Sequence, residues 1–168
     1  MTDTDTRERI AAHVEHNPGV HFSELVRDLD LAPGQVQYHL RRLDASGTDL
    51  FGRTHYFPPD YDAFDRRVVA AARRETARDI LVALLERGPT APATVADDID
   101  VARSTLEWHL DRLVEVDLVR KARDERGRVT LALARPDETP ELLETVDPGL
   151  TERLVDRFGR LLDDLLES

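Results

Sequence analysis

Apolar residues recur at helical spacing near the N-terminus of the chain. Ile10 and Val14 share one face of a helix predicted over residues 7–16. Asp5 and Glu8 have the spacing of a capping box at its start. The pattern therefore predicts a short amphipathic helix that buries one face.

A second and a third helix are predicted after the turn at Asn17-Pro18-Gly19. The second covers residues 22–29, and the third begins at Pro33 and extends to about Ala45, since proline is favoured in the first turn of a helix. The core face of the third helix consists of Val36, Leu40 and Leu43. Two helices joined by a short turn, the second with a polar outer face, form the helix-turn-helix pattern.

The same pattern recurs seventy residues further along the chain. FSELVRDLDLAPGQVQYHLRRL over residues 22–43 aligns without a gap with PATVADDIDVARSTLEWHLDRL over residues 92–113. The offset also carries Ile10 onto Ile80 and Val14 onto Leu84. We conclude that the chain contains an internal duplication.

Strand hairpins are predicted after each copy. Residues 118–123 and 128–134 alternate between apolar and polar around a turn at 124–127. The first copy shows only a short equivalent over 49–57, ended by Pro58-Pro59. The second wing is therefore predicted to be the better formed.

The predicted fold is mainly α with small β-wings: tandem winged helix-turn-helix units plus C-terminal helices. The units cover residues 1–60 and 75–135, and a linker helix over 61–74, which can continue into the second unit, connects them. Residues 136–168 form a C-terminal helical segment, in which Thr139-Pro140 and Asp147-Pro148 are predicted to start two helices.

The last helix has a long apolar stripe. It consists of Leu150, Leu154, Phe158, Leu161, Leu162, Leu165 and Leu166. This stripe exceeds what a terminal helix needs to cover a small domain, so we predict that it forms the interface of a homodimer. Packing back onto the second unit is the alternative.

Both third helices have the form V-x-x-H-L-x-x-L, with Leu106 in place of valine in the second copy. This form resembles the winged helix-turn-helix of ArsR-like regulators, and the tandem arrangement and composition resemble haloarchaeal regulators. The resemblance covers residues 7–135. It implies a DNA-binding transcription regulator with double-stranded DNA as its partner. The thiolate metal sites of the family have no counterpart, because the chain contains no cysteine.

The charge composition changes how the partner is inferred. The net charge is −11, with 34 acidic residues, and Lys121 is the single lysine among 23 basic residues. Abundant acids with almost no lysine are typical of extreme halophiles, where molar salt reduces the Debye length to about 3 Å. We therefore interpret the acidity as an adaptation to solvent. A polar, acidic N-terminus and the lack of a long apolar run predict a cytoplasmic protein without a membrane span.

The outer face of the first copy's third helix is the predicted base-reading surface. It consists of Gly34, Gln35, Gln37, Tyr38, Arg41 and Arg42. Glutamine can read adenine and arginine can read guanine or phosphate, while Gly34 lets a backbone approach closely. A merely solvated helix face is the alternative.

The second copy is predicted to anchor the protein on DNA. The helix start at Arg103, Ser104 and Thr105 can hold a phosphate, and Trp108 and Arg112 lie on the outer face. The wing adds Arg120, Lys121, Arg123, Arg126 and Arg128, which suit backbone or minor-groove contacts. Asp111 and Glu115 oppose DNA contact on the same helix, and Trp108 packed against the linker helix is an open alternative.

Other functions find less support in the sequence. His13 and His16 have helical spacing but no nearby ligand completes a metal site, so no metal or cofactor is predicted. Neither a phosphate-binding loop nor a nucleophile motif is present, so we do not expect an enzyme. The second hypothesis is a winged-helix protein-interaction module that docks to transcription machinery. The sequence assigns no small-molecule effector.

Overall fold

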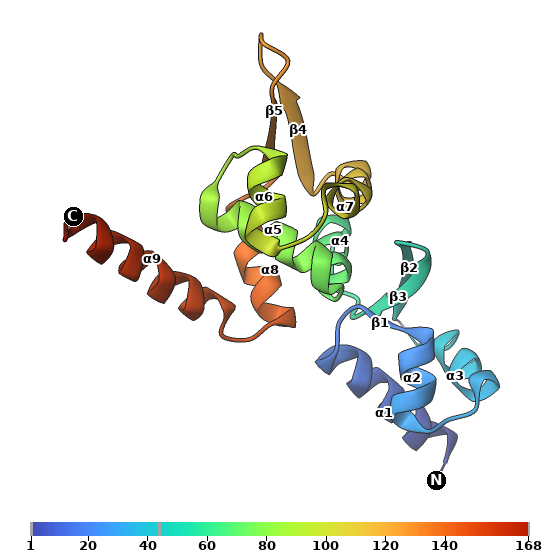
Figure 1. Cartoon of the computed structure of the whole chain (residues 1–168). Coiled ribbons are helices and arrows are strands. Elements are labelled where there is room, and N and C mark those ends of the chain that lie inside the picture. Colours follow the sequence, from blue (N-terminus) through green and yellow to red (C-terminus); the bar gives the residue numbers. More distant parts are fainter. Residues whose placement is uncertain (1, 44, 168) are drawn as a thin grey trace. The chain divides into compact units, whose positions relative to one another are not determined.

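The computed structural model describes residues 2–43 and 45–167, without the side chains of Ser46 and of several residues in the last helix (Figure 1). The chain divides into two compact units, Met1–Ala70 and Ala71–Ser168. The first unit contains α1 (Asp3–His16), β1 (Val20–His21), α2 (Phe22–Leu29), α3 (Pro33–Leu40), β2 (Ser46–Leu50) and β3 (Arg53–Phe57). Then follow α4 (Ala63–Ala72), α5 (Glu75–Arg87), α6 (Pro92–Ile99), α7 (Arg103–Glu115), β4 (Val119–Arg123), β5 (Val129–Leu133), α8 (Thr139–Val146) and α9 (Leu150–Leu166).

The first unit packs three helices and a three-stranded antiparallel sheet around one core. The strand order is β1-β3-β2, and Val20 pairs with Tyr56 while Thr48 pairs with His55. The core consists of Ile10, Val14, Val20, Leu25, Val36 and Leu40. Each fully buried aliphatic side chain of this kind contributes about 1.5–3 kcal/mol relative to an exposed one. The apolar face read from the sequence is therefore the face that holds the unit together.

The second unit repeats this arrangement with α5, α6, α7 and the β4–β5 hairpin. Its core includes Ile80, Leu84, Val95, Leu106, Leu110 and Leu131, each at most 2% exposed. Thr90 forms an isolated bridge with Leu131, in the place where the first unit has β1. The mainly helical fold with small antiparallel sheets and tandem helix-turn-helix units is thus confirmed.

The turn between the two helices of each motif is the same in both units. Asp30 and Asp100 end α2 and α6 in the left-handed conformation, with φ of 52° and 55°. Aspartate tolerates this conformation better than most residues because its short polar side chain can form local hydrogen bonds. Ala32 and Ala102 then adopt extended backbone before the next helix. The duplication therefore extends from sequence to backbone geometry.

Two predicted helix starts differ from the structure. α1 begins at Asp3 rather than Arg7, because Thr2 and Asp5 form the capping box, not Asp5 and Glu8. Asp147 ends α8 as its C-terminal cap instead of starting the last helix, which begins after Gly149 at φ 87°. The other predicted start is correct in place, since α8 begins at Thr139, but Glu138 and not Thr139 is the N-cap, and it forms no side-chain cap hydrogen bond.

The third helix of the first unit is shorter than predicted. α3 ends at Leu40 rather than near Ala45, and Arg41 and Arg42 form the turn that follows. Ser46 and Gly47 are poor helix formers and already belong to β2, so the chain must leave the helix before them. The surface predicted to read bases in the first unit therefore includes a turn as well as a helix.

The first wing was predicted to be the weaker, and this is wrong. β2 and β3 each have five residues, as do β4 and β5, and β1 adds a third strand that the second unit lacks. Phe51 and Gly52 form the two-residue turn, with φ of 53° and 77°. Positive φ at both positions is the geometry of the type I′ hairpin turn.

The C-terminal helix α9 contacts α8 within the second unit. Leu150 is buried at its start, whereas Leu162, Leu165 and Leu166 are 44%, 72% and 85% exposed. The side chains of Leu154, Phe158 and Leu161 lie outside the described residues. Over the described part of the chain, no helix is long and apolar enough to cross a membrane.

Candidate nucleic-acid interface

The predicted reading surface of α3 is exposed along its whole length. Gly34, Gln35, Gln37, Tyr38, Arg41 and Arg42 are all exposed. A Cβ placed on Gly34 would meet nothing within 4 Å, so a ligand can approach the backbone there. One residue is partly engaged, since the side-chain oxygen of Gln35 accepts a hydrogen bond from the Ala32 amide at 3.2 Å.

Tyr38 and Arg42 form one stacked unit on this surface. The Arg42 guanidinium lies 3.7 Å from the centroid of the Tyr38 ring, and its Nη1 donates to the Tyr38 carbonyl at 3.3 Å. Beneath them, the buried His39 ring meets the Tyr38 ring edge-on at 5.1 Å between centroids. A cation over an aromatic face is held electrostatically, so both side chains are oriented before any ligand arrives.

Arg41 differs from Arg42 in having no fixed partner. No acceptor among the described residues contacts its guanidinium, and it caps α3 through its backbone N–H to the Gln37 carbonyl at 3.3 Å. Its five N–H donors are therefore available to a base edge or a phosphate.

On α7, the Glu107 carboxylate pairs with two of the residues predicted to contact DNA, Arg103 and Lys121. Glu107 accepts from the Arg103 Nε at 3.0 Å and from the Lys121 Nζ of β4 at 3.2 Å. Burial raises the pKa of Glu107, but these two hydrogen bonds and the positive charges of Arg103 and Lys121 together hold the pKa below its ordinary value. Both predicted anchors are thus neutralised within the unit, while Ser104 and Thr105 remain exposed at the helix start.

Trp108 and Arg112 repeat the stacked pair of the first unit. The Arg112 guanidinium lies 3.4 Å from the Trp108 ring centroid and donates to the Trp108 carbonyl at 2.7 Å. Trp108 is 48% exposed. His109 meets its ring edge-on at 4.7 Å, as His39 does below Tyr38.

The five basic residues of the second wing differ in whether their side chains have a partner within the unit. Arg128 pairs with Asp124 at 2.8 Å, and Arg123 donates to the Gly127 carbonyl at 3.3 Å. Backbone N–H groups at Arg128 and Arg126 hydrogen-bond Asp124 and help hold its pKa below the ordinary value. The side chains of Arg120 and Arg126 contact no acceptor in the described residues, so they are the available cations of this wing.

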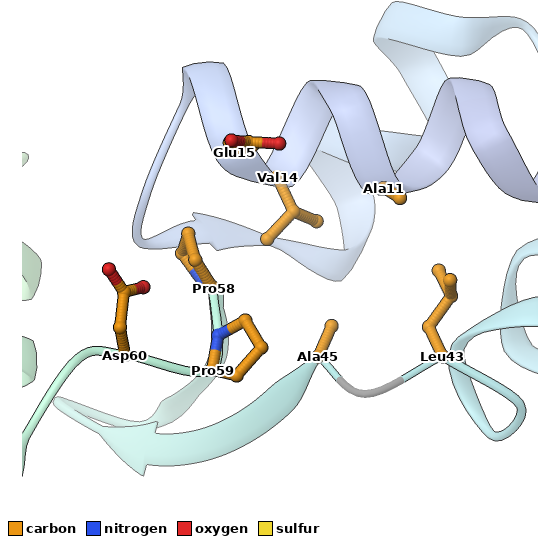
Figure 2. Close-up of a pocket in the computed structure, with 8 residues that line it drawn as sticks. All are labelled: Ala11, Val14, Glu15, Leu43, Ala45, Pro58, Pro59 and Asp60. Atoms are coloured by element: carbon orange, nitrogen blue, oxygen red, sulfur yellow. The ribbon is translucent and has the colours of Figure 1, made fainter.

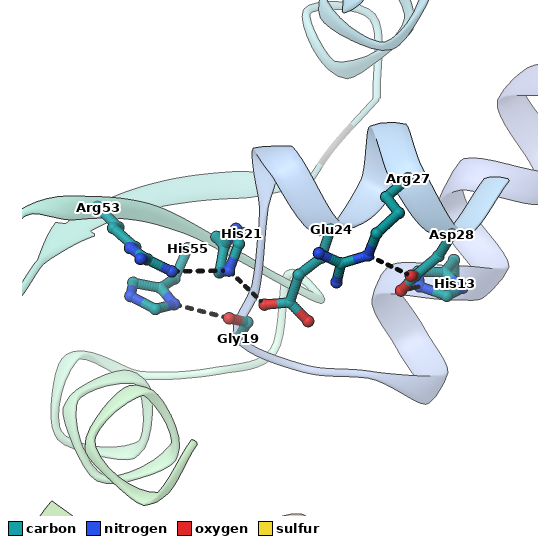
Figure 3. Close-up of polar contacts among 8 residues, drawn as sticks. All are labelled: His13, Gly19, His21, Glu24, Arg27, Asp28, Arg53 and His55. Carbon is teal, nitrogen blue, oxygen red and sulfur yellow. Dashed lines mark hydrogen bonds and ion pairs between the residues drawn. The ribbon is translucent and has the colours of Figure 1, made fainter. Parts of the chain in front are cut away.

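Sequence reasoning missed a basic site at the first wing. His21, Phe22, Ser23, Arg27, Arg53 and Thr54 line a polar hollow of about 530 Å³. Figure 3 shows the His21 ring between Arg53 and Glu24: its Nε2 is 3.0 Å from the Arg53 Nη1 and 2.8 Å from the Glu24 Oε1. The short hairpin predicted over residues 49–57 already contained Arg53, but the pattern along one strand does not show that Arg53 lies beside His21.

Two histidines near the first wing and the helix-turn-helix are held by hydrogen bonds. His13 contacts Asp28 at 3.3 Å, and His55 shares a hydrogen bond with the Gly19 carbonyl at 2.7 Å (Figure 3). Within the residues that the structure describes, no group of three or more histidine or acidic side chains could hold a metal ion.

Comparison with known proteins identifies both units as helix-turn-helix domains. Residues 4–69 match a family model described as an N-terminal HTH domain, and residues 74–122 match one described as a helix-turn-helix domain. The chain is therefore a protein with two helix-turn-helix domains.

A curated relative from Methanocaldococcus jannaschii is named as an uncharacterized HTH-type transcriptional regulator. It is 30% identical over 129 residues, which cover 74% of this chain but only 32% of the relative. A crystal structure of Rv1404 from Mycobacterium tuberculosis is 24% identical, with a TM-score of 0.34, over 57% of this chain and 70% of that one.

Proposed function

We propose that this protein is a transcription regulator that reads promoter DNA mainly through α3 of its first unit. The observation that carries the proposal is the exposed surface of Gln37, Tyr38, Arg41 and Arg42, on the second helix of a helix-turn-helix domain and the turn that follows it. Glutamine and arginine are the side chains that form bidentate contacts with adenine and guanine in the major groove. The M. jannaschii relative, named as a regulator, supports the same function.

The second unit anchors the complex on the phosphate backbone. Arg120 and Arg126 are its available cations, and the hydroxyls of Ser104 and Thr105 are exposed at the start of α7. Phosphate contacts set position without reading sequence, so this unit contributes affinity more than specificity. In the first unit, Arg53 and Arg27 add positive charge beside the wing.

The active form is a homodimer that pairs through α9 and functions in the concentrated salt of a haloarchaeal cytoplasm. The exposed Leu162, Leu165 and Leu166 support this interface, and the composition supports the salt adaptation. Removing residues 148–168 is expected to halve the mass measured by light scattering in molar KCl. An unchanged mass would place the interface elsewhere.

The decisive experiment measures binding to the DNA upstream of the protein's own gene and to a scrambled duplex of equal length. Titrations in molar KCl are needed, because counterion release contributes little there and specific contacts dominate the difference. The wild type is expected to prefer the upstream duplex. Arg126→Ala is expected to weaken binding to both duplexes equally. Equal wild-type binding to both duplexes would contradict the proposal.

Protein docking is the second candidate function, restricted to the second unit. Glu107 neutralises Arg103 and Lys121 beside the exposed Trp108, and tryptophan is enriched where proteins bind each other. If Trp108→Ala leaves all DNA affinities unchanged but abolishes assembly with purified transcription machinery, docking is the function of this unit.

A further inference from the structure

A mostly apolar cavity lies in the first unit, and none of the predicted reading residues lines it. Its lining comes from three segments: the C-terminal half of α1, the connection from α3 to β2, and the residues after β3. The lining residues are Ala11, Val14, Glu15, Leu43, Ala45, Pro58, Pro59 and Asp60, and the cavity volume is about 290 Å³ (Figure 2). We call it the Pro58 cavity.

Several described residues that line the Pro58 cavity belong to the core or pack against it. Val14 is 2% exposed and belongs to the core, and Leu43 and Ala45 pack against that core. Pro58 and Pro59 also line the cavity, and their rings restrict the backbone there. A ligand would therefore lose little free energy to ordering the site.

Two carboxylates and no cation line the Pro58 cavity. Glu15 and Asp60 are exposed, and neither forms a hydrogen bond or an ion pair with any described residue. In the same unit, Asp28 and Glu24 pair with histidines. In Figure 2, Asp60 and Leu43 lie at opposite ends, so one end is acidic and the other apolar.

We propose that the Pro58 cavity binds a compact organic cation, with its charged group near Glu15 and Asp60 and its apolar body against Val14 and Leu43. The volume is at the lower end of the range for small-molecule sites, roughly 300–1,000 Å³. The negative lining disfavours anions, and the apolar walls disfavour small hydrated ions, which keep their water. A singly charged ammonium compound with a small hydrocarbon body satisfies both constraints.

The location gives such a ligand access to the reading surface. Leu43 and Ala45 follow Arg41 and Arg42 closely in the chain, so an occupant contacts residues that come directly after the predicted reading surface. The inference itself does not require DNA binding, and its test uses the full-length protein without DNA.

The test is an NMR titration with three probes: benzyltrimethylammonium, tetramethylammonium and phenylacetate. Saturable shifts are expected at the amides of Ala11, Val14 and Leu43 with benzyltrimethylammonium, at millimolar affinity. Tetramethylammonium has the charge without the apolar body, and phenylacetate has the body with the opposite charge, so both are expected to bind at least about fivefold more weakly.

Variants distinguish the contribution of the two carboxylates to binding from that of the cavity volume. Glu15→Gln with Asp60→Asn is expected to weaken the ammonium probe about fivefold, while Glu8→Gln, an exposed carboxylate on the same helix, leaves it unchanged. Ala11→Leu fills the cavity without touching either charge and is expected to abolish binding. Binding that survives Ala11→Leu, equal binding of phenylacetate, or no saturable shift with the wild type would each overturn the proposal.

Discussion

The two helix-turn-helix units keep the same internal geometry and present different charges. The left-handed aspartate before the third helix and the arginine stacked on an aromatic ring occur in both. At the outward positions, Gln37 and Arg41 of the first unit correspond to Glu107 and Asp111 of the second. Residues that shape the motif have therefore been kept after the duplication, and those that would meet a ligand have changed.

The third helices of the two units also differ in length and in their contacts with the neighbouring wing. α7 continues to Glu115, whereas α3 ends at Leu40, the counterpart of Leu110. In the second unit, Arg103 at the helix start and Lys121 on β4 both pair with Glu107. In the first unit, Gln37 leaves its neighbours Arg41 and Arg42 without a carboxylate partner on α3. This contrast supports the proposal that the first unit reads bases and that the second, in which Glu107 pairs with Arg103 and Lys121, contributes affinity.

The largest expected effect tests whether the units fold separately. Leu106→Ala removes a fully buried side chain of the second core and is expected to cost about 2–5 kcal/mol of the free energy of unfolding. Trp108 is the single tryptophan, so its fluorescence in a urea titration reports on the second unit. Val36→Ala, at the equivalent position of the first core, is expected to leave this transition in place. A shift with Val36→Ala would show that the units unfold together.

The next effect tests which unit reads bases. Arg41→Ala is expected to cost about 1–3 kcal/mol on the specific duplex and to relax discrimination at one base pair. Asp111→Arg places the same side chain at the equivalent position of α7. It is expected to raise the affinity for all duplexes equally, because it adds positive charge near phosphates. Affinities for the specific and scrambled duplexes distinguish these results. If Arg41→Ala leaves both affinities unchanged, the first unit is not the reader.

The sequence predicted the helices of both units because their apolar spacing is regular and repeated. Val36 and Leu106 are both fully buried, as the alignment of the two copies requires. The first wing was underestimated because its turn is Phe51-Gly52, without the Asn-Gly or Asp-Gly that marks a type I′ turn. The contacts of Glu107 could not be predicted, since they depend on how β4 passes α7, which spacing along one element does not specify.

A smaller effect tests the neutralisation of α7. Glu107→Gln is expected to release Arg103 and Lys121 from their carboxylate partner. The logarithm of the affinity should then fall more steeply with the logarithm of the salt concentration. The slope should steepen by about 1 for each cation that gains a phosphate contact. The reciprocal change, Gln37→Glu, is expected to weaken DNA binding by the first unit. A titration series in KCl gives both slopes. An unchanged slope for Glu107→Gln would mean that the two cations do not face DNA.

The smallest effect is a pH dependence confined to the second unit. Burial, together with the positive charges of Arg112 and Arg74, lowers the pKa of His109 below its ordinary value of 6.5. The unfolded chain then binds more protons than the folded one as pH falls below 6.5, so the stability of the second unit is complete above that pH and decreases toward the lowered pKa. Urea titrations followed by Trp108 fluorescence across this window measure the decrease, and NMR of the imidazole gives the pKa directly. His109→Gln is expected to flatten the dependence, because glutamine does not titrate. If the wild type and this variant lose stability in parallel between pH 7 and 5, the loss comes from another group. The proposed link between the lowered pKa of His109 and the stability of the second unit would then be wrong.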